Sequence, residues 1–192
     1  VFISAEPDTF MRSRNVQFQA GGLRPVSRFY PFMDGIAGID VVPKLIEVSM
    51  VSGTFAVGET VEGFVGSEKL ITFRTARPDH KDGTYNAPDV TYNANPYNTS
   101  EILSTQYSAS GSTVNVDTRS LCSNAQGTYF GYITSGMTLV GANSGATANV
   151  TDVRLVTDTF GDLIGTFFIR DPNTNPPPTV RIKSGDRTFR VT

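Results

Sequence analysis

Apolar and polar residues alternate over several short stretches of the chain, which is the pattern of half-buried β-strands. In Asn15–Ala20, Val16 and Phe18 share one face of a predicted strand, and polar residues share the other. The same alternation occurs in Thr113–Asp117 and, less regularly, in Ala146–Val153. These segments predict strands with one face in a core and one face in water.

A second kind of segment is apolar almost throughout. Gly161–Ile169 reads GDLIGTFFI, which is typical of a strand covered on both faces. No stripe with helical spacing extends beyond two turns, whereas β-branched Thr and Val are abundant. The sequence therefore predicts an all-β chain.

Residues that favour turns divide the predicted strands. Gly-containing turns at Asp158–Asp162 and Ser184–Asp186 predict two β-hairpins. Asp79–Thr99 is rich in Asn, Pro, Tyr and Asp and predicts a long loop, a kind of segment that is usually functional or forms an interface. Pro172–Pro178 predicts a short, stiff, polyproline-like connector.

Two Gly-bounded segments resemble each other. SGTFAVG at Ser52–Gly58 and SGMTLVG at Ser135–Gly141 match at four of seven positions. The likeness is explained either by chance among Gly-rich strands or by a small β-barrel in which each copy forms a similar corner.

Composition excludes several classes of protein. The chain has 192 residues, 16 Lys and Arg, and 18 Asp and Glu, which give a net charge of −2. It has neither the charge of a disordered polyelectrolyte nor the basic excess of a nucleic-acid binder. No apolar run approaches the roughly 20 residues that span a bilayer, so no membrane insertion is expected. The chain begins at Val1, as expected of a processed product or a segment of a longer protein.

The residue types that catalysis needs are scarce. His80, the only histidine, lies in a polar loop without the nucleophile elbow of a catalytic triad. Cys122 is the only cysteine, so the several His or Cys ligands of a zinc site are lacking. Asp158 and Asp162 flank Gly161, but the calcium-loop pattern is absent. We therefore expect no enzyme activity, no catalytic residues, no cofactor and no metal.

Arginine and tyrosine suggest a protein interface. There are twelve Arg and four Lys, and Arg makes planar, bidentate contacts that suit interfaces. Tyrosines in the predicted long loop could dock on a partner or could anchor the loop to its own domain. The candidate interface residues are Tyr85, Tyr92, Tyr97, Arg154, Arg181 and Arg190.

Longer stretches resemble a known group of proteins. The clearest are FMRSRNVQFQAGGLRPVSRFYPFMDG (Phe10–Gly35), GTFAVGETVEG (Gly53–Gly63), YSASGSTVNVDTRSL (Tyr107–Leu121), LVGANSGATANV (Leu139–Val150) and LIGTFFIRDP (Leu163–Pro172). In this order they resemble large virion structural proteins of contractile-tailed bacteriophages, those of cyanobacteria in particular.

The resemblance implies a structural module of a phage tail, baseplate or tail fibre. Its location would be the virion, after assembly in the host cytoplasm, and its partners other virion proteins or further copies of itself. The absence of an internal disulfide agrees with folding in a bacterial cytosol.

The strand pattern near both termini leads to a hypothesis about topology. Residues 1–43 and 157–192 would form a discontinuous β-sandwich, and residues 44–156 an inserted β-rich, barrel-like domain that carries the loop 79–99.

Two other functions are alternatives to the structural one. A host-receptor or carbohydrate-binding module would stack sugars on aromatic residues of the Asp79–Thr99 loop, although the chain lacks Trp. A glycan-degrading enzyme would need a pair of carboxylates that no motif singles out.

Overall fold

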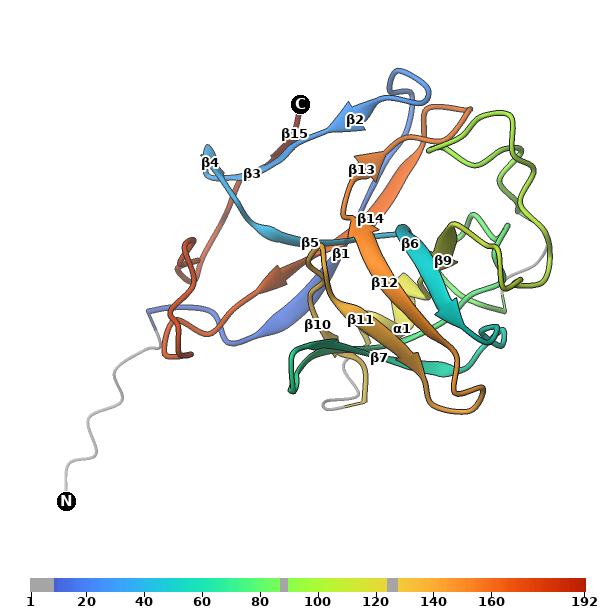
Figure 1. The fold of residues 1–192 in the computed structure, drawn as a ribbon. Helices are drawn as coiled ribbons and strands as arrows, with labels where there is room; N and C mark the ends of the chain where they lie inside the picture. The colour runs from blue at the N-terminus through green and yellow to red at the C-terminus, as the bar shows by residue number, and fades with distance from the viewer. Residues whose placement is uncertain (1–8, 87–89, 124–127) are drawn as a thin grey trace.

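One curled antiparallel sheet dominates the molecule (Figure 1). The computed structural model describes residues 9–86, 90–123 and 128–192. The strands of this sheet lie in the order β10-β8-β7-β11-β12-β6-β9. Their bounds are β6 (Leu45–Ser52), β7 (Thr60–Val65), β8 (Glu68–Arg74), β9 (Thr113–Asn115), β10 (Phe130–Gly131), β11 (Thr138–Gly141) and β12 (Thr147–Asp152).

The curled sheet closes on itself between β8 and β9. Thr75 and Val116, which follow these strands, form an isolated antiparallel bridge. The Ala76 amide donates to Asn115 O at 2.8 Å and the Asp117 amide to Arg74 O at 2.8 Å. The inner face holds one apolar core of Ile46, Val48, Val61, Ile71, Phe73, Val114, Leu139, Ala148 and Val150, with further residues from the loops.

Two hairpins in this sheet start in the same way. A turn with a positive-φ glycine, Gly58 or Gly136, leads into β7 or β11, and both strands begin with Thr. The structural repeat therefore aligns Gly58 with Gly136, whereas the sequence match aligns Gly58 with Gly141. The register of the predicted repeat is wrong because Ser52–Gly58 is the end of β6 and a loop, not a turn and a strand.

Glu59 ties these two hairpins together. Its buried carboxylate accepts hydrogen bonds from the amides of Ala56, Asn143 and Ser144 at 2.6, 3.1 and 3.0 Å, and from Ser144 Oγ at 2.8 Å. A carboxylate is stabilised in a buried position when each oxygen accepts such bonds. Glu59 therefore fixes the β11–β12 turn against the start of β7.

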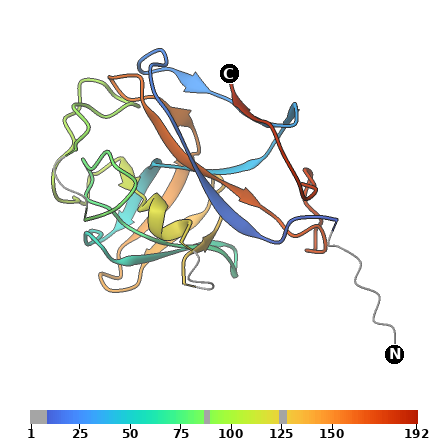
Figure 2. The ribbon, with the colours of Figure 1, turned by 180° about the vertical axis from the view of Figure 1, so that it is seen from behind.

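Strands from both ends of the chain form smaller sheets beside the curled sheet (Figure 2). Their orders are β1-β14-β5, β15-β3-β4 and β13-β2. The bounds are β1 (Arg14–Ala20), β2 (Arg28–Phe29), β3 (Pro31–Met33), β4 (Ile36–Ala37), β5 (Asp40–Pro43), β13 (Leu155–Val156), β14 (Leu163–Ile169) and β15 (Phe189–Val191).

A second apolar core fills the space between these smaller sheets. Its buried members are Met33, Ile39, Val41, Leu155, Leu163, Ile169 and Ile182. The central strand β14 is largely buried, as its continuous apolar pattern predicts. Gly165 in β14 pairs with Phe18 of β1. A Cβ atom at position 165 would lie 2.9 Å from the Phe18 ring, so only glycine leaves room for that ring.

The prediction of an all-β chain is confirmed, since the only helix in the described residues is α1 (Thr118–Leu121). N- and C-terminal strands pair, β1 with β14 and β3 with β15. The arrangement of these strands as a sandwich, and the division into domains at residues 43/44 and 156/157, remain predictions. Within the described residues, no helix has the length and apolar character needed to cross a membrane.

Both predicted hairpins are wrong in their pairing. The Asp158–Asp162 turn is tight, with the Asp158 amide donating to Asp162 O at 3.0 Å, but β13 before it pairs with β2 and β14 after it pairs with β1 and β5. After Ser184–Asp186, β15 pairs with β3 instead of residues 181–183. In each case the strand beside the turn pairs with a strand that is distant in the sequence.

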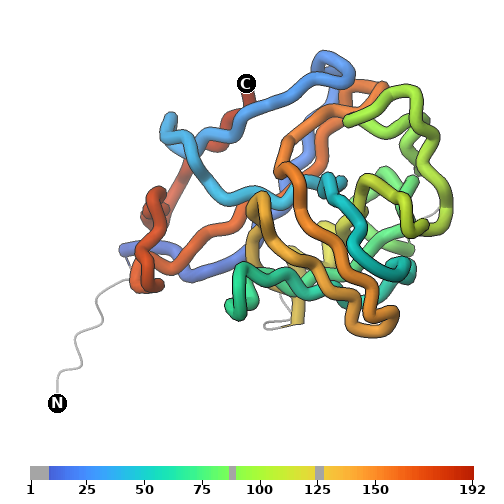
Figure 3. The backbone as a smooth tube through the Cα atoms, in the orientation of Figure 1, coloured from blue at the N-terminus to red at the C-terminus, as the bar shows by residue number. Residues whose placement is uncertain are grey.

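The long predicted loop belongs to the connection between β8 and β9. In its described residues, 75–86 and 90–112, the only ladder contacts are isolated bridges. Figure 3 shows this connection as green tube along one side of the curled sheet. The first turn of the connection is fixed by Asn115 Nδ2, which donates to the carbonyls of Arg77, Pro78 and His80 at 2.9, 3.1 and 2.7 Å.

Candidate functional site

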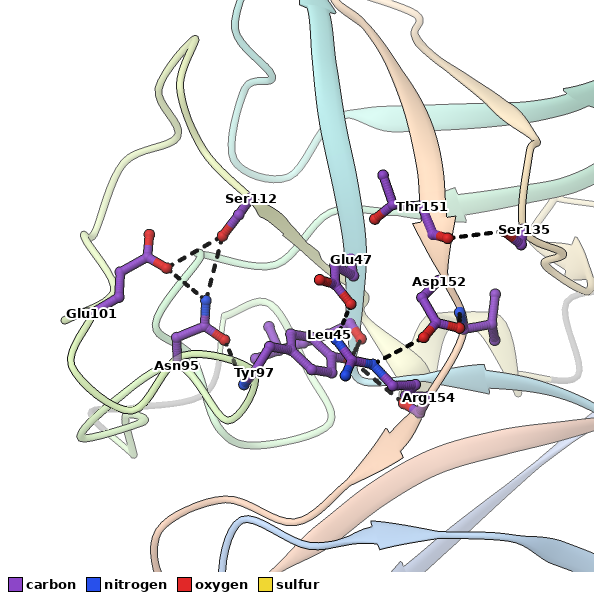
Figure 4. A network of polar contacts seen from close by, with 11 residues as sticks. Leu45, Glu47, Asn95, Tyr97, Glu101, Ser112, Ser135, Thr151, Asp152 and Arg154 are labelled. Carbon is purple, nitrogen blue, oxygen red and sulfur yellow. Dashed lines mark hydrogen bonds and ion pairs between the residues drawn. The ribbon is translucent and has the colours of Figure 1, made fainter.

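Tyr97 and Arg154, two of the predicted interface residues, face each other in a polar network (Figure 4). The Arg154 guanidinium carbon lies 4.8 Å from the centre of the Tyr97 ring. Arg154 forms ion pairs with Glu47 on β6 and, at 3.1 Å, with Asp152 on β12. The Tyr97 hydroxyl donates to Leu45 O. Both residues therefore attach the long connection to the curled sheet.

The same network continues outward along the connection (Figure 4). Asn95 Nδ2 donates to Glu101 Oε2 at 2.8 Å, and Ser112 Oγ donates to the same oxygen at 3.2 Å. Asn95 Oδ1 accepts from the Tyr97 amide at 2.9 Å. These bonds give the connection a fixed shape without regular secondary structure.

Tyr92 is buried beside the same network, at 8% exposure. It lines a cavity of about 10 Å³ together with Lys44, Tyr97 and Arg154. That volume holds at most about one water molecule, so it is no ligand site. Burial raises the pKa of Tyr92 well above its usual value. For Tyr92 and Tyr97, the structure favours the anchoring alternative over docking on a partner.

Lys81 clamps the connection to the turn before β14. Its ammonium nitrogen forms ion pairs with Asp158, at 3.1 Å, and with Asp162. It also lies 4.7 Å from the centre of the Phe160 ring. Burial lowers the pKa of Lys81, but the bonds to the two carboxylates outweigh burial and raise it. Asp158 and Asp162, the two aspartates that flank Gly161, thus bind the ammonium group of Lys81.

The other three predicted interface residues lie nearer the surface. Tyr85 is half-buried under the Arg74 guanidinium, whose carbon is 3.5 Å from the ring centre. Arg181 and Arg190 are exposed, and Arg190 lies 5.2 Å from the centre of the Phe32 ring. The structure therefore brings Tyr92, Tyr97 and Arg154 together beside the curled sheet, whereas Arg181 and Arg190 are exposed at the surface.

The described residues offer little for acid–base or metal chemistry. His80 is 2% exposed and lies in the turn held by Asn115. Burial raises the pKa of the Cys122 thiol to about 12, which keeps it protonated and unreactive at neutral pH. Across residues 9–86, 90–123 and 128–192, no three His, Cys, Asp or Glu side chains are grouped to hold a metal ion.

A cleft of about 590 Å³ lies between the curled sheet and β14. Its aromatic residues are Phe130 on β10, Tyr132 just after it, and Phe168 on β14. The ring centres of Phe130 and Phe168 are 4.9 Å apart at 86°, and those of Tyr132 and Phe168 are 5.6 Å apart at 22°. The volume lies in the range of small-molecule sites, roughly 300–1,000 Å³.

Hydroxyl and amide groups surround this aromatic floor. They come from the residue before β1, from β8, from the segment before β10 and from the Pro172–Pro178 connector: Ser13, Thr72, Thr128, Thr174 and Asn175. A cleft with an apolar floor and a few polar groups is the usual form of a binding site for a small organic molecule.

The charges in the cleft are largely compensated. Arg170 Nε lies 2.7 Å from Asp40 Oδ2, and its guanidinium carbon lies 4.1 Å from the centre of the Tyr132 ring. Burial raises the pKa of Asp40, and the bond to Arg170 opposes that shift. Lys69 pairs with Glu62 at 2.9 Å. Glu68 is exposed at the rim.

The cleft leaves no recognisable motif in the sequence. Its aromatic residues lie in two short strings, YFGY at 129–132 and FFIR at 167–170, which read as ordinary strand segments. An aromatic at an outward position of a predicted strand is the only local signal, and it cannot show that two such strands meet. Comparison with family models, curated proteins and solved structures finds no match to this chain.

Proposed function

We propose that the chain is a structural module of a tailed-bacteriophage virion, in the tail, baseplate or tail fibre. It is assembled into the particle in the host cytoplasm and does not act as an enzyme. The proposal starts from the resemblance of its ordered sequence segments to virion proteins, which extends over nearly the whole chain after Glu6.

The observation that best supports a structural role is the attachment of the long connection between β8 and β9 to the rest of the molecule. A connection of this length often serves as a mobile lid over a reaction site. Here Tyr97 and Arg154 attach it to β6 and β12, and Lys81 attaches it to the turn before β14. A part of a virion needs a persistent shape, and these attachments supply one.

In this proposal, neighbouring subunits contact the module near its exposed arginines. Arg190 lies on β15, an edge strand of the β15-β3-β4 sheet, and Ile36 on the opposite edge strand β4 is 53% exposed. Edge strands with exposed apolar residues are common points of association between chains. The partner proposed for this sheet is another virion protein or a second copy of this chain.

Immunogold electron microscopy tests the assignment. Antibodies raised against the purified chain should label the tail region of purified phage particles. Antibody absorbed beforehand with the purified chain serves as the control and should leave particles unlabelled. Antigen found only in the soluble fraction of infected cells, with bare particles, would contradict the proposal.

A carbohydrate-binding role on the Asp79–Thr99 loop is not favoured by the contacts of its tyrosines. Tyr92 and Tyr97 are engaged inside the molecule, so their rings are not presented to a sugar. A glycan would need a different surface.

A further inference from the structure

We propose that the cleft between β8, β10 and β14 binds a neutral oligosaccharide. This inference stands on the geometry of the cleft and does not depend on the virion assignment. Either proposal can fail while the other holds.

The aromatic floor of the cleft presents one exposed ring, that of Phe130. Phe130 is 43% exposed although it lies in a strand, and its ring stands edge-on to Phe168. An aromatic ring held in this way presents a flat apolar surface with little conformational entropy left to lose. The apolar face of a pyranose ring packs on such a surface, while its hydroxyl groups point to the side.

The polar groups around the floor are mostly hydroxyls and an amide. Four of the surrounding residues, Ser13, Thr72, Thr128 and Thr174, carry hydroxyls that both donate and accept, and the Asn175 amide does the same with separate atoms. Arg170 uses two of its five N–H groups on Asp40 and keeps the others as donors. Sugar hydroxyls need this mixture of donors and acceptors.

The charges around the cleft disfavour an acidic ligand. The positive charges of Lys69 and Arg170 are compensated by Glu62 and Asp40, and Glu68 adds a negative charge at the rim. A nucleotide, a phosphate or an acidic sugar would meet no net positive potential here. The neutral members of the carbohydrate class therefore fit best.

An extended peptide strand is the competing occupant of the cleft, but the edge of β10 already has a hydrogen-bonding partner at Gly131. Asn15 Nδ2 donates to Gly131 O at 2.7 Å, and the Gly131 amide donates to Asn15 Oδ1 at 3.0 Å. These bonds use the backbone groups that an added strand would need at Gly131.

Saturation-transfer NMR and titration calorimetry test the site. The probes are short linear oligomers of glucose, galactose, mannose and N-acetylglucosamine, together with sialylated and sulfated counterparts. At least one neutral oligomer should bind with a Kd below about 1 mM. Phe130→Ala should raise that Kd about tenfold, as the loss of a central aromatic contact does.

Two further variants make the test specific. Phe160→Ala removes an aromatic that is 56% exposed but lies outside the cleft, and it should leave the Kd unchanged. Asn175→Ala removes one hydrogen-bonding side chain from an exposed connector, so it should weaken binding even if Phe130→Ala fails to fold. No binding by any neutral oligomer, equal effects of Phe130→Ala and Phe160→Ala, or preference for the acidic sugars would overturn the proposal.

Discussion

Lys44 illustrates how one buried residue makes the whole fold sensitive to pH. Its side chain is 2% exposed, and Nζ donates to Val116 O at 2.6 Å. Burial lowers the pKa of Lys44 to about 7, although the nearby charges of Asp117 and Asp82 oppose the shift. An unfolded lysine keeps its proton up to a pKa near 10.5. Between these two values the unfolded chain binds more protons than the folded one, so stability rises with pH.

The prediction is that the free energy of unfolding increases from pH 7.5 to pH 9, by up to about 1.4 kcal/mol per pH unit, and that Lys44→Met removes this increase. Urea unfolding at several pH values measures it. The exposed Lys183 offers the matched control, since Lys183→Met should keep the wild-type dependence on pH. A wild-type curve that is flat over this range would show that Lys44 is not the titrating group.

At the scale of elements, the long connection depends on a few charged and aromatic contacts instead of a hydrogen-bonded ladder. Lys81 is the clearest example, because it joins the connection to the turn that contains Asp158 and Asp162. Asp158 is 1% exposed, and removal of its cation would leave a buried carboxylate uncompensated.

We therefore expect Lys81→Met to loosen the connection while the curled sheet stays intact. Hydrogen exchange should speed up at least about tenfold at the amides of Lys81 and Tyr92, which donate to Val90 O and Asp79 O. Amides of β7 and β11 should exchange as in the wild type. Lys69→Met, which breaks an exposed ion pair on β8, controls for loss of charge. If hydrogen exchange at residue 81 and Tyr92 were unchanged in the variant, the ion pairs of Lys81 would not be needed to hold the connection in place.

At the scale of the whole molecule, a few residues join the two cores. Val153 packs against both, and Phe168 of β14 contacts Phe130 of the curled sheet. Asn15 of β1 bonds both backbone groups of Gly131 on β10. Because these contacts cross from one core to the other, the cores should lose their structure together.

Calorimetry of the wild type should accordingly show a single unfolding transition. Asn15→Ala should lower the free energy of unfolding by about 2 kcal/mol, because it leaves a buried N–H and a buried carbonyl without partners. Gln17→Ala, on the same face of β1, loses one bond to Thr118 Oγ1 and should cost less than half as much. Two separate transitions in the wild type would refute the coupling of the cores.

The alternation of polar and apolar residues gives the wrong burial for several polar side chains. Asn15 and Asn115 lie on faces that the alternation marks as polar, yet they are 5% and 0% exposed. Each is buried because its amide bonds the backbone of a distant segment, β10 for Asn15 and the turn near His80 for Asn115. Alternation reports the polarity of a face, but it does not show what covers that face.

Local patterns in the sequence are enough to predict that this protein is built from β-strands, where its turns and long connection lie, and that β14 is covered on both faces. These features follow from local properties: the period of two, β-branched residues, glycine and proline. The folded chain adds which strands pair, the contact of Tyr92, Tyr97 and Arg154, and the cleft lined by Phe130, Tyr132 and Phe168. The physical reason is that strand pairing and contacts between distant residues depend on which apolar faces fit together. No short segment of the sequence contains that information, because it involves two segments that are far apart in the chain.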